Sequence, residues 1–296
     1  MPIVLVLGAT GIIGNEVASQ FIRKGYEVFG LARTEEKANQ LRRVEIQPIL
    51  ANAQETNKWI DVAKKADIII EAIADYSNND VQFAVFEALS TIAKERPSVV
   101  IIYTNGVWMY GNNNGQLITE NQPMINSNVI LAPRIELGKQ YSKLGAITIL
   151  PSLVYGGSGA HSGGYFRAIE TGEITLYGAG QYQTYIHYID IAAMYIAAAE
   201  RANELRGEIF IAGAYVDKVE DIVQGIAKAL GKTVKVTHVQ PADPYQECLA
   251  LNQRASNAKA QIKLNWRPTQ LSLIDGAKKY YEAWKILAPA ATNYKY

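Results

Sequence analysis

Three glycines near the start of the chain have the spacing of a phosphate-binding turn. Gly8, Gly11 and Gly14 interrupt the stretch "IVLVLGATGIIGNEV" (residues 3–17) at intervals of three. In such a turn the first glycine permits a sharp bend, the second admits a pyrophosphate to the backbone, and the third lets the next helix pack on the sheet. Free N–H groups at the helix start favour the phosphates. The pattern indicates dinucleotide binding, and the alternative is a purely structural turn.

This chemistry requires a strand before the glycines and a helix after them. Residues 3–8 are apolar and rich in β-branched side chains, which is typical of a buried strand. Residues 15–25 place apolar side chains on one face and end at a glycine, as helices often do. The same alternation continues, with strands expected at 26–32, 44–51, 67–73 and 98–105 and helices at 34–42, 57–66 and 80–96.

Such an alternation with fully apolar strands predicts an α/β fold, a Rossmann-type doubly wound parallel sheet with helices on both faces. Beyond residue 105 the rhythm loosens into a Gly/Asn-rich loop at 111–128 and a helix at 132–143. One long buried strand is expected at 146–156. Further helices are expected at 189–202, 218–232 and 270–287, with strands at 207–213 and 233–239.

Composition excludes several classes of protein. A net charge of +1 argues against a nucleic-acid binder. The single cysteine, Cys248, forbids an intrachain disulfide and a Cys-based structural zinc site, and three distant histidines show no metal-ligand spacing. No signal-peptide pattern and no apolar run of about 20 residues is present. We expect a cytoplasmic protein with no metal and no membrane partner, and its oligomeric state, monomer or homodimer, stays open.

Five motifs in order resemble the extended branch of the short-chain dehydrogenase/reductase superfamily, whose members include epimerases and dehydratases. They are "LGATGIIG", "YTNGVWMYG", "ILPSLVYGGSG", "IHYIDIAAMYIAAAE" and "ASNAKAQIKLNWRPTQLSLIDG". The resemblance implies a dinucleotide-binding Rossmann domain, placed at 1–155. It implies a smaller, mainly substrate-binding part at 156–296, with segments that return to the main sheet.

The end of the second strand selects the cofactor. By resemblance, NAD enzymes of this family place an acidic residue there, but this chain has Arg33 and no carboxylate before Glu35. A guanidinium pairs well with a 2′-phosphate, so NADP(H) is expected over NAD(H); the alternative is a solvated helix start. We expect the cofactor site to comprise Gly8, Thr10, Gly11, Ile12, Ile13, Gly14, Arg33, Asn52, Ala72, Ile73, Ser152 and Leu153.

The chain departs from the family's catalytic pattern. By resemblance, proton transfer rests on a Ser or Thr, a Tyr, and a Lys four residues later that lowers the tyrosine pKa. Residues 112–138 contain no tyrosine and no lysine, and the serine position is Gly106. Tyr141 and Lys143 are two residues apart, so on a helix they point in different directions. The fold and the cofactor site are therefore expected to transfer, while the usual mechanism is not.

Other side chains are candidates for the chemistry. Thr104 or Asn105 is expected to polarise a substrate carbonyl, with His161 or water as the proton source. Tyr155, His187 and Tyr185 are expected around the substrate, although His187 could equally be structural and the tyrosine-rich stretch 177–188 could be sheet packing.

The leading function is NADPH-dependent reduction of a small, largely uncharged carbonyl compound, or the reverse oxidation. The first alternative is a catalytically silent regulator that senses NADP(H). The second is a nucleotide-sugar epimerase or dehydratase, which the absence of any arginine between Arg167 and Arg201 makes less favoured.

Overall fold

The computed structural model describes residues 1–74 and 78–288. Its main sheet has seven strands, every neighbouring pair is parallel, and the strand order is β11-β7-β5-β4-β1-β2-β3. This confirms the predicted α/β class. The strands are β1 (Ile3–Leu7), β2 (Glu27–Ala32), β3 (Gln47–Leu50), β4 (Ile68–Glu71), β5 (Val100–Thr104), β7 (Ile147–Pro151) and β11 (Ile209–Ala212).

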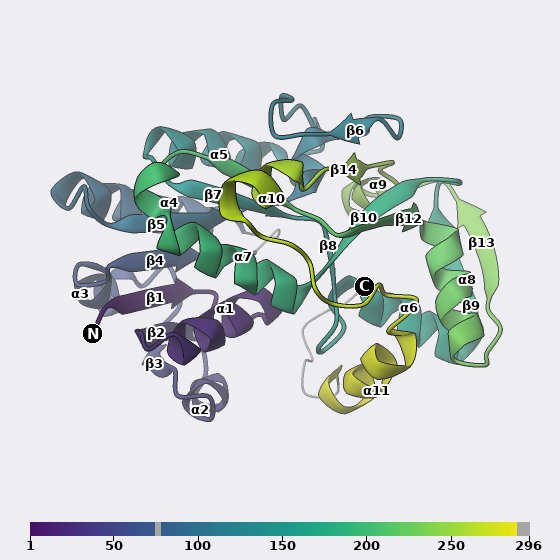
Figure 1. Ribbon diagram of the computed structural model, residues 1–296, viewed down its shortest axis with the longest axis horizontal. Helices are drawn as coiled ribbons and strands as arrows, with labels where there is room; N and C mark the ends of the chain where they lie inside the picture. The colour runs from purple at the N-terminus through teal and green to yellow at the C-terminus, as the bar shows by residue number, and fades with distance from the viewer. Residues whose placement is uncertain (75–77, 289–296) are drawn as a thin grey trace.

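Helices cover both faces of this sheet because successive strand residues point to opposite sides. In β4, Ile68 and Ile70 join one core and Ile69 joins the other. The first core is covered by α1 (Ile12–Arg23), α2 (Glu35–Arg42), α7 (Tyr188–Glu200) and α10 (Ala258–Leu264); the second by α3 (Ile60–Ala63), α4 (Asn79–Glu95) and α5 (Ala132–Lys143) (Figure 1).

The order of the strands reverses between β1 and β4. Beyond β1 the sheet continues to β2 and β3 on one side and to β4, β5 and β7 on the other. Ligands of open α/β sheets bind at such a switch point, outside the carboxyl ends of the strands. The turn after β1 therefore lies where a ligand is expected.

The prediction of one long strand at 146–156 is wrong in one respect, because the segment forms two strands that belong to two different sheets. Ser152 still donates its backbone N–H to Ala212 of the main sheet, at 2.9 Å. The chain then leaves, and β8 (Leu153–Tyr155) pairs in parallel with β10 (Tyr182–His187). In the same small sheet β12 (Tyr215–Lys218) pairs antiparallel with β10. Apolar side chains on both strands hid the break.

A third core lies to the right of the main sheet in Figure 1, around large aromatic side chains such as Phe166, Tyr280 and Trp284. Its elements are α6 (Ala160–Thr171), α8 (Val219–Ala229), α9 (Pro244–Leu249), α11 (Ala277–Leu287), and the paired strands β9 (Glu173–Tyr177) and β13 (Lys235–Val239). The expected helix at 270–287 therefore begins only at Ala277.

Three further departures are small. The helix expected at 57–66 is a 3₁₀ turn (Thr56–Lys58) followed by the short α3, and other 3₁₀ turns span Val107–Tyr110 and Ala202–Glu204. Inside the loop expected at 111–128, β6 (Leu117–Ile118) pairs with β14 (Arg254–Ala255).

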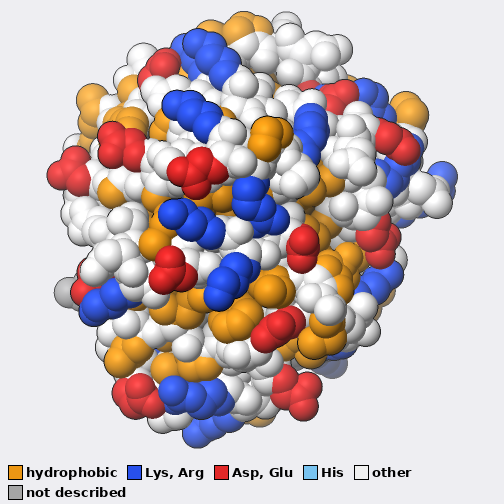
Figure 2. All heavy atoms as spheres, turned by 90° about the vertical axis from the view of Figure 1, so that its left-hand side faces the viewer, with side chains coloured by type: hydrophobic (Ala, Val, Ile, Leu, Met, Phe, Trp, Pro, Cys, Tyr) orange, Lys and Arg blue, Asp and Glu red, His pale blue; other side chains and the backbone are white. Residues whose placement is uncertain are grey.

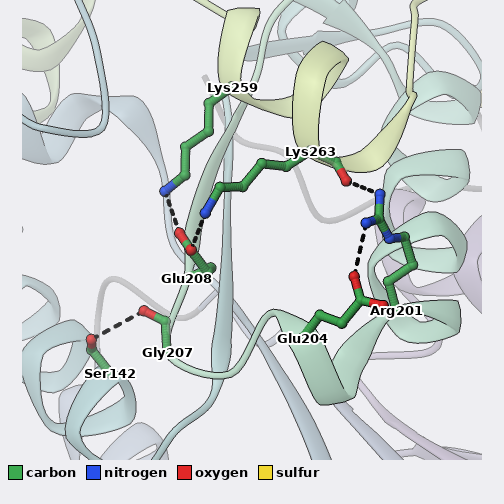
Figure 3. A network of polar contacts seen from close by, with 7 residues as sticks. All are labelled: Ser142, Arg201, Glu204, Gly207, Glu208, Lys259 and Lys263. Atoms are coloured by element: carbon green, nitrogen blue, oxygen red, sulfur yellow. Dashed lines mark hydrogen bonds and ion pairs between the residues drawn. The ribbon is translucent and has the colours of Figure 1, made fainter.

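Charged side chains fasten the start of β11 to α10. Glu208 contacts Lys259 at 2.7 Å and also Lys263 (Figure 3). Arg201 contacts Glu204 at 2.8 Å in the same picture. On the face at the left of Figure 1, acidic and basic side chains are interspersed (Figure 2). No helix in the described ranges is long and apolar enough to span a membrane.

Candidate active site at the carboxyl edge of the main sheet

The glycine turn after β1 tolerates side chains at only one of its three positions. Gly8 has φ +97°, and a Cβ there would lie 2.5 Å from the carbonyl oxygen of Ala72. A Cβ on Gly14 would overlap the carbonyl oxygen of Gly8. A Cβ on Gly11 would meet nothing closer than 3.4 Å. Gly8 and Gly14 are therefore required by packing, while the space over Gly11 is open to a ligand.

The amino end of α1 faces this space without a cap of its own. Gly11 occupies the N-cap position, no side chain bonds to it, and the first turn holds no acidic residue. The first N–H groups of a helix lack partners within the helix, and the helix dipole adds positive potential. Ile12 and Ile13 in this first turn and Thr10 before it are half-buried. The cradle fits the pyrophosphate of a dinucleotide.

Arg33 and Asn52 lie at the ends of the next two strands. Arg33 follows β2, is exposed, and makes no hydrogen bond or ion pair within the described part of the chain. Thr34 caps α2 by accepting the Lys37 N–H at 3.2 Å. Asn52 is exposed beyond β3, and its backbone N–H donates to Glu55 at 2.7 Å. The Arg33 guanidinium is thus available to an anionic ligand.

Thr104 lies at the end of β5 with its hydroxyl fully engaged. Its Oγ1 donates to the carbonyl of Glu71 at 2.7 Å and lies 2.6 Å from the hydroxyl of Tyr195. Because a threonine hydroxyl carries one hydrogen, the second contact must be donated by Tyr195. No O–H remains to polarise a carbonyl, so the geometry does not favour that predicted role for Thr104.

Asn105, unlike Thr104, keeps a hydrogen-bond donor and an acceptor that are not used by other residues of the described chain. It is buried, and its Nδ2 donates one hydrogen to the carbonyl of Arg134 at 3.1 Å. Its Oδ1 has no partner among the described residues, and the amide keeps a second hydrogen. Of the two predicted polarising residues, Asn105 retains a free donor.

Two charged residues of this edge were missed by sequence reasoning. Arg134 on α5 is 2% exposed and donates to the carbonyls of Thr104 (3.1 Å) and Ile73 (3.5 Å). Glu71 at the end of β4 is 1% exposed and accepts the Ile73 N–H at 2.9 Å. Burial raises the pKa of Glu71 to about 7, and Arg134 opposes the rise.

Both residues left a signal in the sequence. Arg134 is the sole lysine or arginine in 112–138, in the helix where the family carries its lysine. Glu71 interrupts an otherwise apolar strand. Charged residues are rarely buried, so a charged residue in a segment that is predicted to be buried is a candidate for a specific role.

His161, the predicted proton source, lies on α6. Its Nδ1 accepts the backbone N–H of Val154 at 3.3 Å, and its ring lies edge-on to Trp108 at 5.7 Å. Burial lowers the pKa of His161 to about 4, so the ring is neutral at pH 7. Since Nδ1 accepts, the hydrogen is on Nε2, which is a hydrogen-bond donor rather than an imidazolium.

The three residues expected around the substrate are interior side chains. The Tyr155 hydroxyl donates to the carbonyl of Leu271 at 2.7 Å. The hydroxyls of Tyr185 and Tyr165 lie 3.1 Å apart. His187 caps α7, because its Nδ1 accepts the Ile189 N–H at 3.3 Å. The three side chains are buried with these partners, and their place around a substrate stays a prediction.

The remaining predicted residues lie close to the same edge. Ala72 and Ile73 follow β4 and are half-buried. Ser152 is buried at the break between β7 and β8, and its Oγ has no partner among the described residues. Leu153 is buried in β8. Within the described ranges, no group of His, Cys, Asp and Glu has the arrangement of a metal site.

An open cleft of about 430 Å³ lies between residues 110–129 and α9. Tyr110 lines it, is 4% exposed, and has a hydroxyl without a partner in the described chain. Asparagine side chains and Glu247 supply further polar groups, and among the described residues that line the cleft none is a lysine, arginine or histidine. A small uncharged ligand suits it better than a phosphate.

Comparison with known proteins agrees with this geometry. Residues 4–129 match the sequence model of the NAD dependent epimerase/dehydratase family. An uncharacterized protein of Schizosaccharomyces pombe is 23% identical over 290 residues, which is 92% of this chain and 96% of that protein.

Two solved enzymes share the fold along almost the whole chain. A dTDP-glucose 4,6-dehydratase from Bacillus anthracis in complex with NAD has a TM-score of 0.80 at 17% identity, covering 97% of both chains. A UDP-glucuronic acid 4-epimerase from Bacillus cereus, in complex with UDP-glucuronic acid and NAD, has a TM-score of 0.78 at 22% identity, covering 96% of this chain and 99% of that one. The match over residues 4–129 makes this part of the chain similar to the NAD dependent epimerase/dehydratase family, and the fold shared along the whole chain is consistent with an atypical member of the extended short-chain dehydrogenases/reductases.

Proposed function

We propose that the protein is an NADP(H)-binding oxidoreductase that reduces a small, largely uncharged carbonyl compound. The observation that carries the cofactor preference is the unpartnered Arg33 at the end of β2, beside the open cradle over Gly11. A carboxylate there would repel a 2′-phosphate, whereas a guanidinium pairs with it through two parallel hydrogen bonds.

Each part of the edge has a role in this proposal. The uncapped start of α1 holds the pyrophosphate, Arg33 holds the 2′-phosphate, and Asn52 lies near the adenine. The bound nicotinamide supplies hydride chemistry. The protein orients the substrate and donates hydrogen bonds to its carbonyl oxygen through Asn105 Nδ2 and His161 Nε2.

A neutral imidazole suits this task. A histidine held neutral at pH 7 polarises a carbonyl by hydrogen bonding without adding a full charge to the site. The low pKa of His161, which burial produces, keeps it in that state, and the Val154 N–H fixes the tautomer. In this role His161 keeps its Nε2 hydrogen, and water supplies the proton that the product alkoxide takes up after hydride transfer.

Cofactor titration tests the proposal. NADPH and NADH are titrated into the protein and binding is followed by nucleotide fluorescence. NADPH is expected to bind at least ten-fold tighter, a difference of about 1.4 kcal/mol. Arg33→Asp should abolish the preference. Arg43→Asp makes the same charge change at the exposed far end of α2 and should keep it. Equal affinities in the parent protein would contradict the assignment of Arg33.

Turnover separates the alternatives. NADPH consumption against a panel of uncharged aldehydes and ketones supports the reductase. Tight binding with no turnover of any compound favours an NADP(H)-sensing regulator.

The second alternative is a nucleotide-sugar epimerase or dehydratase, which the two solved enzymes favour. The cation-free cleft gives no counter-charge for a sugar-nucleotide diphosphate. Conversion of a UDP- or dTDP-sugar in the same assay would establish that alternative and overturn the reductase.

A further inference from the structure

The backbone of one residue after β4, Ile73, is held on both sides by side chains of opposite charge. Glu71 accepts the N–H of Ile73 at 2.9 Å, and Arg134 donates to the carbonyl of Ile73 at 3.5 Å. A second Arg134 nitrogen donates to the carbonyl of Thr104 at 3.1 Å. The same segment is backed by Gly8, whose Cβ position is closed by the Ala72 carbonyl. The ends of β1, β4 and β5 are thus linked at one point.

This arrangement is costly for a core that needs only stability. Both charged side chains are almost fully buried, and burying two charges costs desolvation that apolar side chains of similar volume would avoid. The Glu71 Oε2 also lacks a partner among the described residues, so the carboxylate is incompletely satisfied. A role beyond packing accounts for keeping such a pair at the edge of the sheet.

We propose that Glu71 and Arg134 are positioning residues of the cofactor site: the ionised pair holds the Ala72–Ile73 segment in the shape that receives a dinucleotide, and protonation of Glu71 loosens it. The inference rests on the proposed function, because it assumes that a dinucleotide lies over the glycine turn. Neither side chain touches the cofactor in this proposal, and both act through the backbone of Ile73.

The groups around Glu71 leave it as the one that titrates near neutrality. Arg134 and Tyr141 interact with it from α5 and Tyr195 from α7, and Tyr103 is its register partner on β5. Arginine keeps its proton throughout, and burial raises the pKa of Tyr141 and of Tyr195 above its ordinary value. The pKa of Glu71, near 7, therefore gives the pair a signature that a purely structural role lacks: cofactor affinity that depends on pH around neutrality.

Binding as a function of pH tests the inference. Affinities for NADPH and NADH are measured from about pH 8 to about pH 6, because NADH lacks the 2′-phosphate, which itself ionises near pH 6. For the parent protein, NADH affinity is expected to fall about ten-fold over this range. A flat NADH profile would overturn the inference while leaving the cofactor assignment intact.

The variants are chosen to avoid an unpaired buried charge. Glu71→Gln alone leaves Arg134 uncompensated and is liable to unfold, so the test uses Glu71→Gln combined with Arg134→Met. This double variant should bind NADH about ten-fold more weakly at pH 8 and show no further loss at lower pH. The single variant Arg134→Lys keeps both Glu71 and a cation at position 134. Its NADH affinity should therefore keep part of the pH dependence that the double variant loses. Glu208→Gln, in the ion-pair cluster of Figure 3, is the matched control and should titrate like the parent.

Amide hydrogen exchange at Ile73 in the absence of cofactor gives a separate readout. Exchange should be faster in the double variant than in the parent and unchanged in Glu208→Gln. Equal protection at Ile73 in parent and double variant would overturn the inference. If the parent bound neither nucleotide, the proposed function would fail, and the exchange measurement would still decide whether the pair holds this peptide.

Discussion

The carboxyl edge of the main sheet and the small sheet of β8, β10 and β12 are both rich in polar side chains, but they treat them differently. In the small sheet the hydroxyls of Tyr155 and Tyr185 and the Nδ1 of His187 all have partners. At the main edge, Arg33 is unpaired in the described chain, and Glu71 Oε2 and Asn105 Oδ1 have no partner there. Both regions contain tyrosine, histidine, asparagine or charged side chains, so residue type alone does not distinguish them. The two regions therefore differ in whether these polar groups have hydrogen-bond partners, and this difference is the reason why we place the candidate site at the main edge.

The largest expected effect breaks the main edge directly. Gly11→Val should abolish dinucleotide binding while leaving the fold intact, because its side chain would fill the space over the helix start without meeting protein atoms closer than 3.4 Å from Cβ. Gly164→Val, on α6 with open space around it, is the control for folding. Circular dichroism and NADPH fluorescence measure the two properties. Undiminished NADPH binding by the first variant would reduce the motif to a turn.

A pair of histidine variants compares the two regions. His161→Ala should lower kcat by about 10²–10⁴-fold, the usual value of a proton-handling group, with little loss of stability. His187→Ala should instead cost about 1 kcal/mol of folding free energy through loss of the α7 cap. Steady-state kinetics and urea unfolding are to be measured on both. A larger kcat loss for His187→Ala would reverse the assignment of the two regions.

The free energy of unfolding below pH 6.5 gives a second test of the structural role of His187. Burial lowers the pKa of His187 from 6.5 to about 4, so the unfolded chain binds the extra proton between these values. The neutral ring therefore contributes stability that is full above pH 6.5 and is lost as the pH falls toward 4. His187→Asn keeps an N-cap acceptor but cannot titrate. Its free energy of unfolding should fall less between these pH values than that of the parent, and identical slopes would contradict the shift.

The smallest effect is expected at the tyrosines that the family pattern would suggest. Tyr141→Phe and Tyr110→Phe should each change kcat by less than about ten-fold, well below the loss of a general acid. Tyr141 is stacked on Tyr103 with centroids 4.1 Å apart, and burial raises its pKa far above neutrality. A thousand-fold loss for Tyr141→Phe alone would show that the family mechanism survives in a shifted form.

Sequence patterns predicted the layers of the fold well, because apolar runs and helical periodicity report burial directly. The helix expected at 132–143 is α5, with the same bounds. The break at Ser152 was not visible, since β7 and β8 are both buried and differ only in which sheet they join.

At the candidate site, the glycines and Arg33 could be proposed from spacing alone. Glu71 and Arg134 could not, because they are 63 positions apart (134 − 71) and meet only through the packing of α5 on the sheet. The engagement of Thr104 by Tyr195 is equally non-local, and no motif reports it.

The return of β11 to the main sheet has a consequence for how the chain folds. β11 pairs with β7 and comes from the second half of the sequence. During synthesis, β7 would therefore emerge with an unpaired edge and wait for about sixty residues before its neighbour is available. An exposed strand edge invites pairing with other chains. A fragment ending at residue 155 would keep that edge permanently, so it should aggregate in conditions where the whole chain remains monodisperse.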